Sequence, residues 1–447
     1  MRLENWIHHT IGTACGDAAA TASLSRADVQ RYQLRMLNRT LRYCREHSSF
    51  YAELFRSAGA PAGDIAGLGD LARFPLTEPQ YLSDSPYRFL CTSQAEVARP
   101  YTFITSGTTG PKKKIFWTQG DLNRIVAFMA AGIGTVADPG DAVLVLLPDG
   151  RPNSQSDLLR QGVAAMGARP VVAESDISAG EFVAALESSR CRVVFGYTRK
   201  IFRLSKELER RTDLRKFGVR VLFLASEYLP PAMRRELSRL WGCDIRTHYG
   251  LTEMGLGVAV ECEAHDGLHF NEADLLLEVV DPSTGLPLPP GEEGELVFTT
   301  LTREAMPLIR YRTHDLSRVR REPCPCGQHG LLRIETVRKR LESTAPFGQG
   351  SEIHPALLDD ILFEIPGLVD YQAVATREHG IDRLGFKIEM VPEQTGRISE
   401  IRAKLAAAPP FAGHLAARGM FEPEIELVPY GSLQTVGRAK KLIVDRR

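Results

Sequence analysis

The sequence lacks the features that mark membrane and nucleic-acid-binding proteins. No apolar run is long enough to cross a bilayer, and the first six residues, MRLENW, include an acid and lack the apolar core of a signal peptide. Basic and acidic residues both number 55, so no excess charge attracts nucleic acid or an anionic membrane. We therefore expect a cytoplasmic protein that binds small molecules.

The chain also lacks the cysteine pattern of a disulfide scaffold. Its eight cysteines are dispersed, and Cys324 and Cys326 form the tight pair, which suits a reducing compartment. A hydrophobic content of 43% and a charged content of 25% are ordinary for a globular enzyme. The 447 residues are enough for two or three domains, and a homodimer is compatible with this size.

A loop rich in glycine and hydroxyls occupies residues 105–114, between two strand-like segments. Small residues let backbone N–H groups converge on a phosphate, and lysines such as Lys112 supply positive charge. Two residues rather than four separate its glycines, so it is not the common P-loop. A solvated turn is the alternative, but the order of hydroxyls, glycines and lysines favours a nucleotide phosphate. The predicted donors are Thr105, Ser106, Gly107, Thr108, Thr109 and Gly110.

A second motif, Tyr249-Gly-Leu-Thr-Glu253, suits the same ligand. A carboxylate is the ligand that a hard cation bridging phosphates prefers, and an aromatic ring can pack on a purine. A tight turn capped by threonine would explain the motif alone. Its combination with the first loop makes that explanation unlikely.

These motifs resemble the signatures of the adenylate-forming superfamily of acyl- and aryl-CoA ligases, synthetase adenylation domains and luciferases. Within it, the chain most resembles the phenylacetate–CoA ligase branch. The resemblance implies that Tyr249 packs on adenine, that Thr252 lies near the α-phosphate, and that Glu253 binds the nucleotide's Mg²⁺. Thr252 and Glu253 are thus candidate catalytic residues.

Two further acids match the family's ribose and adenine positions. Asp315, in the stretch Tyr-Arg-Thr-His-Asp, matches the residue that holds the ribose hydroxyls, although His314 replaces the usual glycine. A carboxylate can accept from two vicinal hydroxyls. Glu227, after a strand-like run, matches a residue of the adenine and ribose pocket.

Short apolar runs alternate with helical stretches after the loop, as in residues 142–147, 192–195 and 220–224. This alternation predicts a parallel α/β sheet. Helical spacing from about Arg26 to Ala58 predicts a packing helix. The resemblance implies an α/β fold with a β-rich subdomain in a large N-terminal domain, residues 1–336, and a small α+β domain, residues 337–447.

Cys262, His269, Cys324 and Cys326 form a candidate zinc site, because three thiolates and an imidazole suit tetrahedral Zn²⁺. The set resembles the structural zinc site of some members of this branch. Its rival ligands are His265 and His329, and the alternative is a proline-rich turn with reduced cysteines.

The C-terminal part departs from the family. At the hinge, Arg338 survives, but Arg340 and Leu341 stand where the family has two acids. The lysine that contacts the α-phosphate falls on Arg438, with Lys440 nearby as a substitute. A guanidinium can still balance charge on the phosphate, so adenylation is not excluded.

Three readings of function follow. The first is an AMP-forming ligase that activates an aromatic acid with ATP and passes it to CoA. The second is a diazotase of secondary metabolism that uses ATP to join nitrite to an aromatic amine, which the altered hinge favours. The third is a degenerate nucleotide-binding protein, which the intact motifs disfavour. The aromatic acid itself cannot be identified from sequence.

Overall fold

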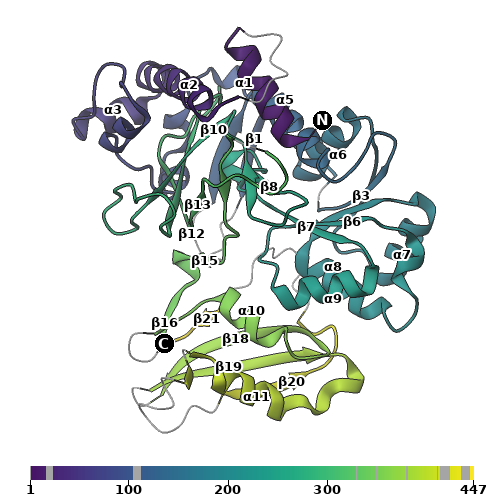
Figure 1. Ribbon diagram of the computed structural model, residues 1–447. Helices are drawn as coiled ribbons and strands as arrows, with labels where there is room; N and C mark the ends of the chain where they lie inside the picture. Colours follow the sequence, from purple (N-terminus) through teal and green to yellow (C-terminus); the bar gives the residue numbers. More distant parts are fainter. Residues whose placement is uncertain are drawn as a thin grey trace. The chain divides into compact units, whose positions relative to one another are not determined.

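The computed structural model divides into two compact units (Figure 1). The first comprises residues 1–141, 149–170 and 248–337, and the second comprises residues 142–148, 171–247 and 338–447. The described residues are 2–16, 24–103, 112–148, 150–328, 330–347, 351–378, 381–409, 411–412, 423–433 and 443–447. Among these, no helix is sufficiently long and apolar to cross a membrane.

The first unit contains helices that pack around antiparallel sheets. Strands β1 and β2 form a hairpin, β10, β11 and β12 form a sheet, and β8, β9, β14 and β13 pair in that order. The helices are α1 (Leu3–Ala14), α2 (Arg26–His47), α3 (Ser49–Ser57), α4 (Tyr81–Asp84), α5 (Gln119–Ile133) and α6 (Gln155–Ala165). The strands are β1 (Arg99–Phe103), β2 (Lys113–Trp117), β8 (Ala259–Glu261), β9 (Leu268–Phe270), β10 (Leu275–Val280), β11 (Gly294–Thr300), β12 (Tyr311–Ser317), β13 (Val319–Arg320) and β14 (Arg333–Ile334).

The prediction of one helix from Arg26 to Ala58 is wrong, because the chain breaks at Ser48. That residue has an extended conformation, with φ −100° and ψ 115°. Its side chain accepts a hydrogen bond from the Tyr51 N–H and so caps a new helix, α3. The apolar spacing continues through the break, which is why periodicity alone does not reveal it.

The second unit is built on a parallel sheet. Strands β3, β5, β6 and β7 pair in parallel, as the alternation of strand and helix predicted. The helices are α7 (Ala179–Ser189), α8 (Thr198–Leu208), α9 (Pro231–Trp241), α10 (Pro355–Leu362) and α11 (Ile398–Ala407). The strands are β3 (Ala142–Leu146), β4 (Arg169–Ala173), β5 (Val193–Tyr197), β6 (Val221–Ala225), β7 (Asp244–Tyr249), β15 (Lys339–Arg340), β16 (Ala345–Phe347), β17 (Ser351–Ile353), β18 (Leu368–Glu378), β19 (Ile381–Met390), β20 (Glu424–Val428) and β21 (Val444–Asp445).

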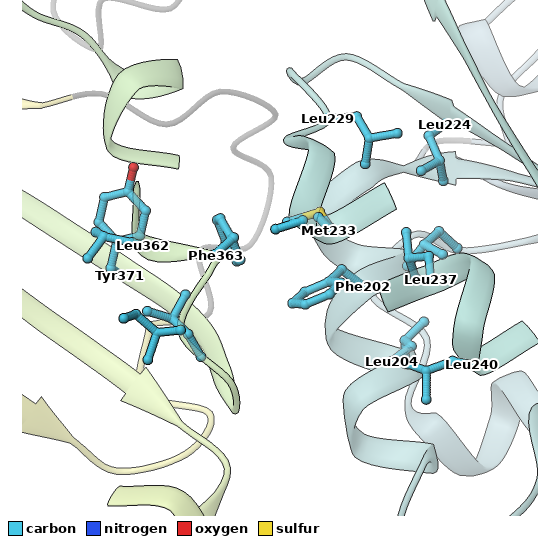
Figure 2. Packing of buried hydrophobic residues seen from close by; sticks show 14 of the residues in the cluster. Phe202, Leu204, Leu224, Leu229, Met233, Leu237, Leu240, Leu362, Phe363 and Tyr371 are labelled. Atoms are coloured by element: carbon cyan, nitrogen blue, oxygen red, sulfur yellow. The ribbon is translucent and has the colours of Figure 1, made fainter. Parts of the chain in front are cut away.

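The C-terminal elements of the second unit share a core with its parallel-sheet part. Strands β18 and β19 are antiparallel, and β21 and β20 add to them in parallel (Figure 1). Phe363, just after α10, packs its ring 5.5 Å from that of Phe202 on α8, next to Met233 (Figure 2). The α/β class is confirmed, whereas the boundary near residue 337 stays a prediction because residues 338–447 belong to the same compact unit as residues 171–247.

Candidate active site and metal centre

A buried lysine, glutamate and tyrosine meet in the first unit. On β2, Lys113 shares its inward face with Ile115 and Trp117, because alternate residues of a strand point the same way. Its ammonium lies 3.1 Å from Glu253 Oε1 and donates to the Tyr311 hydroxyl at 2.9 Å. That hydroxyl donates to Glu253 Oε1 at 2.7 Å.

These contacts determine the charge state of Glu253. Burial by itself would raise the pKa of this carboxyl, but the Lys113 ammonium and the Tyr311 hydroxyl lower it below the ordinary value. Glu253 is therefore ionised at neutral pH, which is the form that binds a cation. Thr252 begins the short 3-10 helix Thr252–Met254 that presents Glu253.

Tyr249 and Asp315, the residues predicted to contact adenine and ribose, are hydrogen-bonded to each other. The Tyr249 hydroxyl donates to Asp315 Oδ2 at 2.6 Å. On β12, Asp315 faces inward with Tyr311 and Thr313, while His314 lies between with φ 60°. This left-handed conformation explains why glycine suits position 314, and the His314 N–H donates to Glu295 Oε1 at 2.9 Å.

Glu227 and Arg338 lie in the second unit. Glu227 accepts the Arg199 N–H at 2.9 Å, and burial raises its pKa to about 7 although Arg199 opposes this. Arg338 pairs with Asp360 on α10 and lies over the Tyr228 ring at 5.5 Å. Both residues are thus already engaged by protein groups.

The predicted zinc ligands come together in the first unit. Cys262 Sγ lies 3.5 Å from Cys324 Sγ, and Cys326 Sγ lies 3.5 Å from His269 Nε2. All four donor atoms lie within 4.8 Å of one another. Thiolates bound at about 2.3 Å by a tetrahedral zinc are about 3.8 Å apart, so the set fits the metal.

The protonation of His269 also suits a metal ligand. Burial lowers its pKa to about 4, which leaves the ring neutral at pH 7. The rival His265 instead places Nδ1 3.0 Å from Glu261 Oε1 and is not among the clustered donors. The other rival, His329, lies outside the described residues.

Comparisons with known proteins decide the family. Residues 92–301 match the model of the AMP-binding enzyme family, and residues 350–447 match that of the AMP-binding enzyme C-terminal domain. A phenylacetate–coenzyme A ligase of Aromatoleum evansii is 31% identical, over 97% of this chain and 98% of its own length. The chain belongs to the AMP-binding enzyme family. The predicted resemblance to the phenylacetate–CoA ligase branch is confirmed.

A second sequence relative agrees with this family, and a solved structure shows the fold. A phenylacetate–coenzyme A ligase of Thermus thermophilus is 32% identical over 82% of this chain and 83% of its own. A crystal structure of 2-hydroxyisobutyryl-CoA ligase with 2-HIB-AMP has a TM-score of 0.82 at 21% identity, covering 95% of this chain and 91% of that one. At that identity the likeness shows the fold alone.

The predicted site residues differ in how far the structure describes them. Lys112 is exposed beside the loop. The loop residues Thr105–Gly110 lie outside the described residues, and so do Arg438 and Lys440. Sequence reasoning treated Lys113 only as one of three lysines, with Lys112 and Lys114, that supply charge for a phosphate, and it gave Tyr311 no role. The alternation of β2, which points Lys113 inward with Ile115 and Trp117, was the signal that could have identified the lysine.

Proposed function

We propose that this chain is an ATP-dependent, AMP-forming ligase that activates an aromatic carboxylic acid and passes it to CoA. The relatives named phenylacetate–coenzyme A ligases support this assignment. The observation that carries it is the ionised Glu253, held by Lys113 and Tyr311 in the same unit as the Tyr249–Asp315 pair. Together they offer a cation-binding carboxylate and a nucleoside-binding pair.

In this proposal each residue has a definite role. Tyr249 packs on adenine, and Asp315 accepts from the ribose hydroxyls, assisted by Glu227. Glu253 holds Mg²⁺, which neutralises charge on the phosphates when bound. The loop Thr105–Gly110 and Lys112 bind the phosphates, while Thr252 lies at the α-phosphate.

The reaction has two steps. A carboxylate oxygen of the acid attacks the α-phosphorus, and the bond to pyrophosphate breaks. Arg438, with Lys440 as its substitute, balances the charge that develops there. The CoA thiolate then attacks the acyl carbonyl and AMP leaves. Arg338 would serve at the hinge between the two steps.

A diazotase is the second candidate, supported by a specific observation. The two hinge acids are replaced by Arg340 and Leu341, and Arg338 is engaged with Asp360. An enzyme that joins nitrite to an aromatic amine would not need the conformation that accepts CoA. The nucleotide residues would act as before.

The deciding experiment measures AMP release from ATP and Mg²⁺ with pooled aryl and amino-aryl acids, in the presence of CoA, of nitrite, or of neither. We expect AMP that depends on CoA. AMP release that requires nitrite and is unaffected by CoA would instead establish the diazotase. Tight ATP binding without AMP in any arm would contradict both and support a degenerate nucleotide-binding protein.

We further propose that Cys262, His269, Cys324 and Cys326 hold a structural Zn²⁺. The support is a compact set of donors remote in sequence, whose reduced thiols also suit a cytoplasmic location. Cys326→Ser should lower the zinc content and the melting temperature, whereas Cys15→Ser, at an exposed cysteine, should change neither. Purified protein with no zinc, and no loss of stability on chelation, would refute the proposal.

A further inference from the structure

A hollow opens to solvent in the first unit, beside the loop that follows Glu253. Met254, Gly255 and Gly257 form one wall, and Ile125 and Phe128 of helix α5 form another. A Cβ at Gly257 would overlap the Phe128 ring, so the loop can approach α5 only with glycine there. One wall of the hollow therefore lies one to four residues after a proposed catalytic carboxylate, and polar side chains such as Thr302 and Asp274 complete the lining.

A positively charged side chain lines this hollow. Arg303 follows strand β11, and its Nη1 nitrogen is buried and has no hydrogen-bond partner among the residues that the structure describes. Its Nη2 nitrogen lies 3.5 Å from the position that a Cβ on Gly255 would occupy. Buried donors are nearly always paired, because an unmade hydrogen bond to a charged group is costly.

The neighbouring carboxylates do not satisfy Arg303, since both are engaged by other groups. Asp121 Oδ1 accepts the Glu304 N–H at 2.8 Å, and its Oδ2 accepts the Ala305 N–H at 3.0 Å. Asp274 accepts from the Thr302 hydroxyl at 2.7 Å. These acids act on Arg303 through space only.

Asp274 has two further donors, the Asn271 amide at 3.0 Å and Arg124 at 3.3 Å. Burial lowers the pKa of Arg303, opposed by Asp121 and Asp274, but a guanidinium starts so high that it stays protonated at neutral pH. The hollow thus presents a cation for which the described residues supply no bound acceptor.

Water can reach this hollow and accept a hydrogen bond, but it carries no charge to balance the guanidinium. A carboxylate supplies both the charge and two acceptor oxygens, and it fits the planar fork of arginine. The apolar walls of Ile125, Phe128 and Met254 suit a ring attached to that carboxylate.

We propose that the hollow is a substrate subsite in which Arg303 binds a carboxylate on the aromatic ring, remote from the reacting group. The inference rests on the proposed function and specifies its substrate class: an aromatic compound with a second acidic group. In the ligase reaction the substrate is then a diacid, of which one carboxylate is adenylated and the other stays ionised on Arg303.

The first test compares phenylacetate with 3-carboxyphenylacetate as acids for AMP release by the wild-type protein and by Arg303→Met. We expect the wild type to have a KM at least about tenfold lower for the diacid, as one charge-assisted hydrogen bond allows. Arg303→Met should abolish that preference and leave the KM for ATP unchanged. Arg31→Met, at an exposed arginine, should keep it. Equal KM values for both acids in the wild type, or an unaltered preference in Arg303→Met, would overturn the inference.

A binding experiment separates failure of this inference from failure of the proposed function. Isothermal titration without ATP should show that isophthalate binds the wild type at least about tenfold more tightly than benzoate, and that Arg303→Met loses the difference. If the wild type releases no AMP with any acid, the ligase function is rejected, but the subsite is not. No isophthalate binding, or equal competition by acetate, would reject the subsite.

The stability of the variant provides a check against a merely structural role. Removing an unpaired buried charge should leave the melting temperature equal or raise it. If Arg303→Met melts lower than the wild type and keeps the preference for the diacid, the arginine is a packing residue and the proposal fails.

Discussion

Two clusters of buried charged side chains, one in each unit, are satisfied to different degrees. In the first unit, the side-chain donors to Glu253 within the described residues are one lysine and one tyrosine hydroxyl. In the second, Arg199 on α8 binds Asp359 at 2.6 Å and Asp370 at 3.0 Å, and Asp359 also accepts from the Tyr371 hydroxyl at 2.6 Å. Few partners leave Glu253 able to exchange one for a ligand, whereas many partners fix a structure.

A second ion pair, which also uses an arginine of α8, extends this contrast. Arg203 on α8 pairs with Glu389 on β19, whose side chain is fully buried. The two oxygens of Glu389 also accept the N–H groups of Gly431 and Leu433, at 2.8 and 3.1 Å. Those residues immediately precede the segment that carries Arg438. The second unit therefore uses its buried ions to hold its own backbone.

The largest effect on stability that we expect comes from removing the ion pair between Arg203 and Glu389 in the second unit. Glu389→Gln removes the negative charge opposite Arg203, which cannot lose its proton, and places an NH₂ against N–H donors. The free energy of unfolding should fall by about 3–5 kcal/mol in denaturant titration. Glu400→Gln, in an exposed pair with Arg397, should cost less than about 1 kcal/mol. A loss of stability at Glu389 no larger than that at Glu400 would erase the contrast between the two clusters.

A smaller effect, on activity rather than on stability, should follow from Lys113→Met in the first unit. Without the ammonium, the pKa of the buried Glu253 rises and the carboxyl takes up a proton, which limits the cost in stability. AMP release should fall about 100-fold, as when one stabilising electrostatic contact is lost. Initial rates at saturating ATP, beside thermal melts, measure both quantities. Full activity in this variant would show that Glu253 does not need its lysine.

The smallest effect concerns pH and lies in the second unit. His354 caps α10 by accepting the Leu357 N–H on Nδ1 at 3.2 Å, and burial, with Lys339 and Arg338, lowers its pKa to about 4. The folded protein thus binds fewer protons than the unfolded chain between pH 6.5 and 4, so stability falls as pH falls through that window.

His354→Asn keeps a good capping side chain without the titration. Unfolding free energies at pH 7 and pH 4.5 should therefore differ by about 1–2 kcal/mol more in the wild type than in the variant. Equal pH dependence in both proteins would show that this cap does not titrate.

How much the sequence predicts depends on whether a feature is local. The parallel strands appear as apolar runs such as residues 142–147, because burial on both faces demands them. The clustering of Cys262, His269, Cys324 and Cys326 was predicted from donor chemistry and from the family resemblance, although the two halves are remote in the chain. By contrast, the partnership of Arg203 with Glu389, 186 residues apart, has no local signature. The break at Ser48 was hidden by apolar spacing that continues through it.

The apolar contact between Phe363 and Phe202, in the same unit as the Arg203–Glu389 pair, determines which fragments of this protein can fold alone. A fragment that begins at Arg338 would leave behind the α8 surface on which Phe363 packs. It would also carry Asp359, Asp370 and Glu389 away from both of their arginines. Such a fragment would expose the apolar surface around Phe363 together with unpaired acidic side chains, and it should tend to aggregate. Autonomous folding is therefore expected only of a fragment that retains residues 171–247.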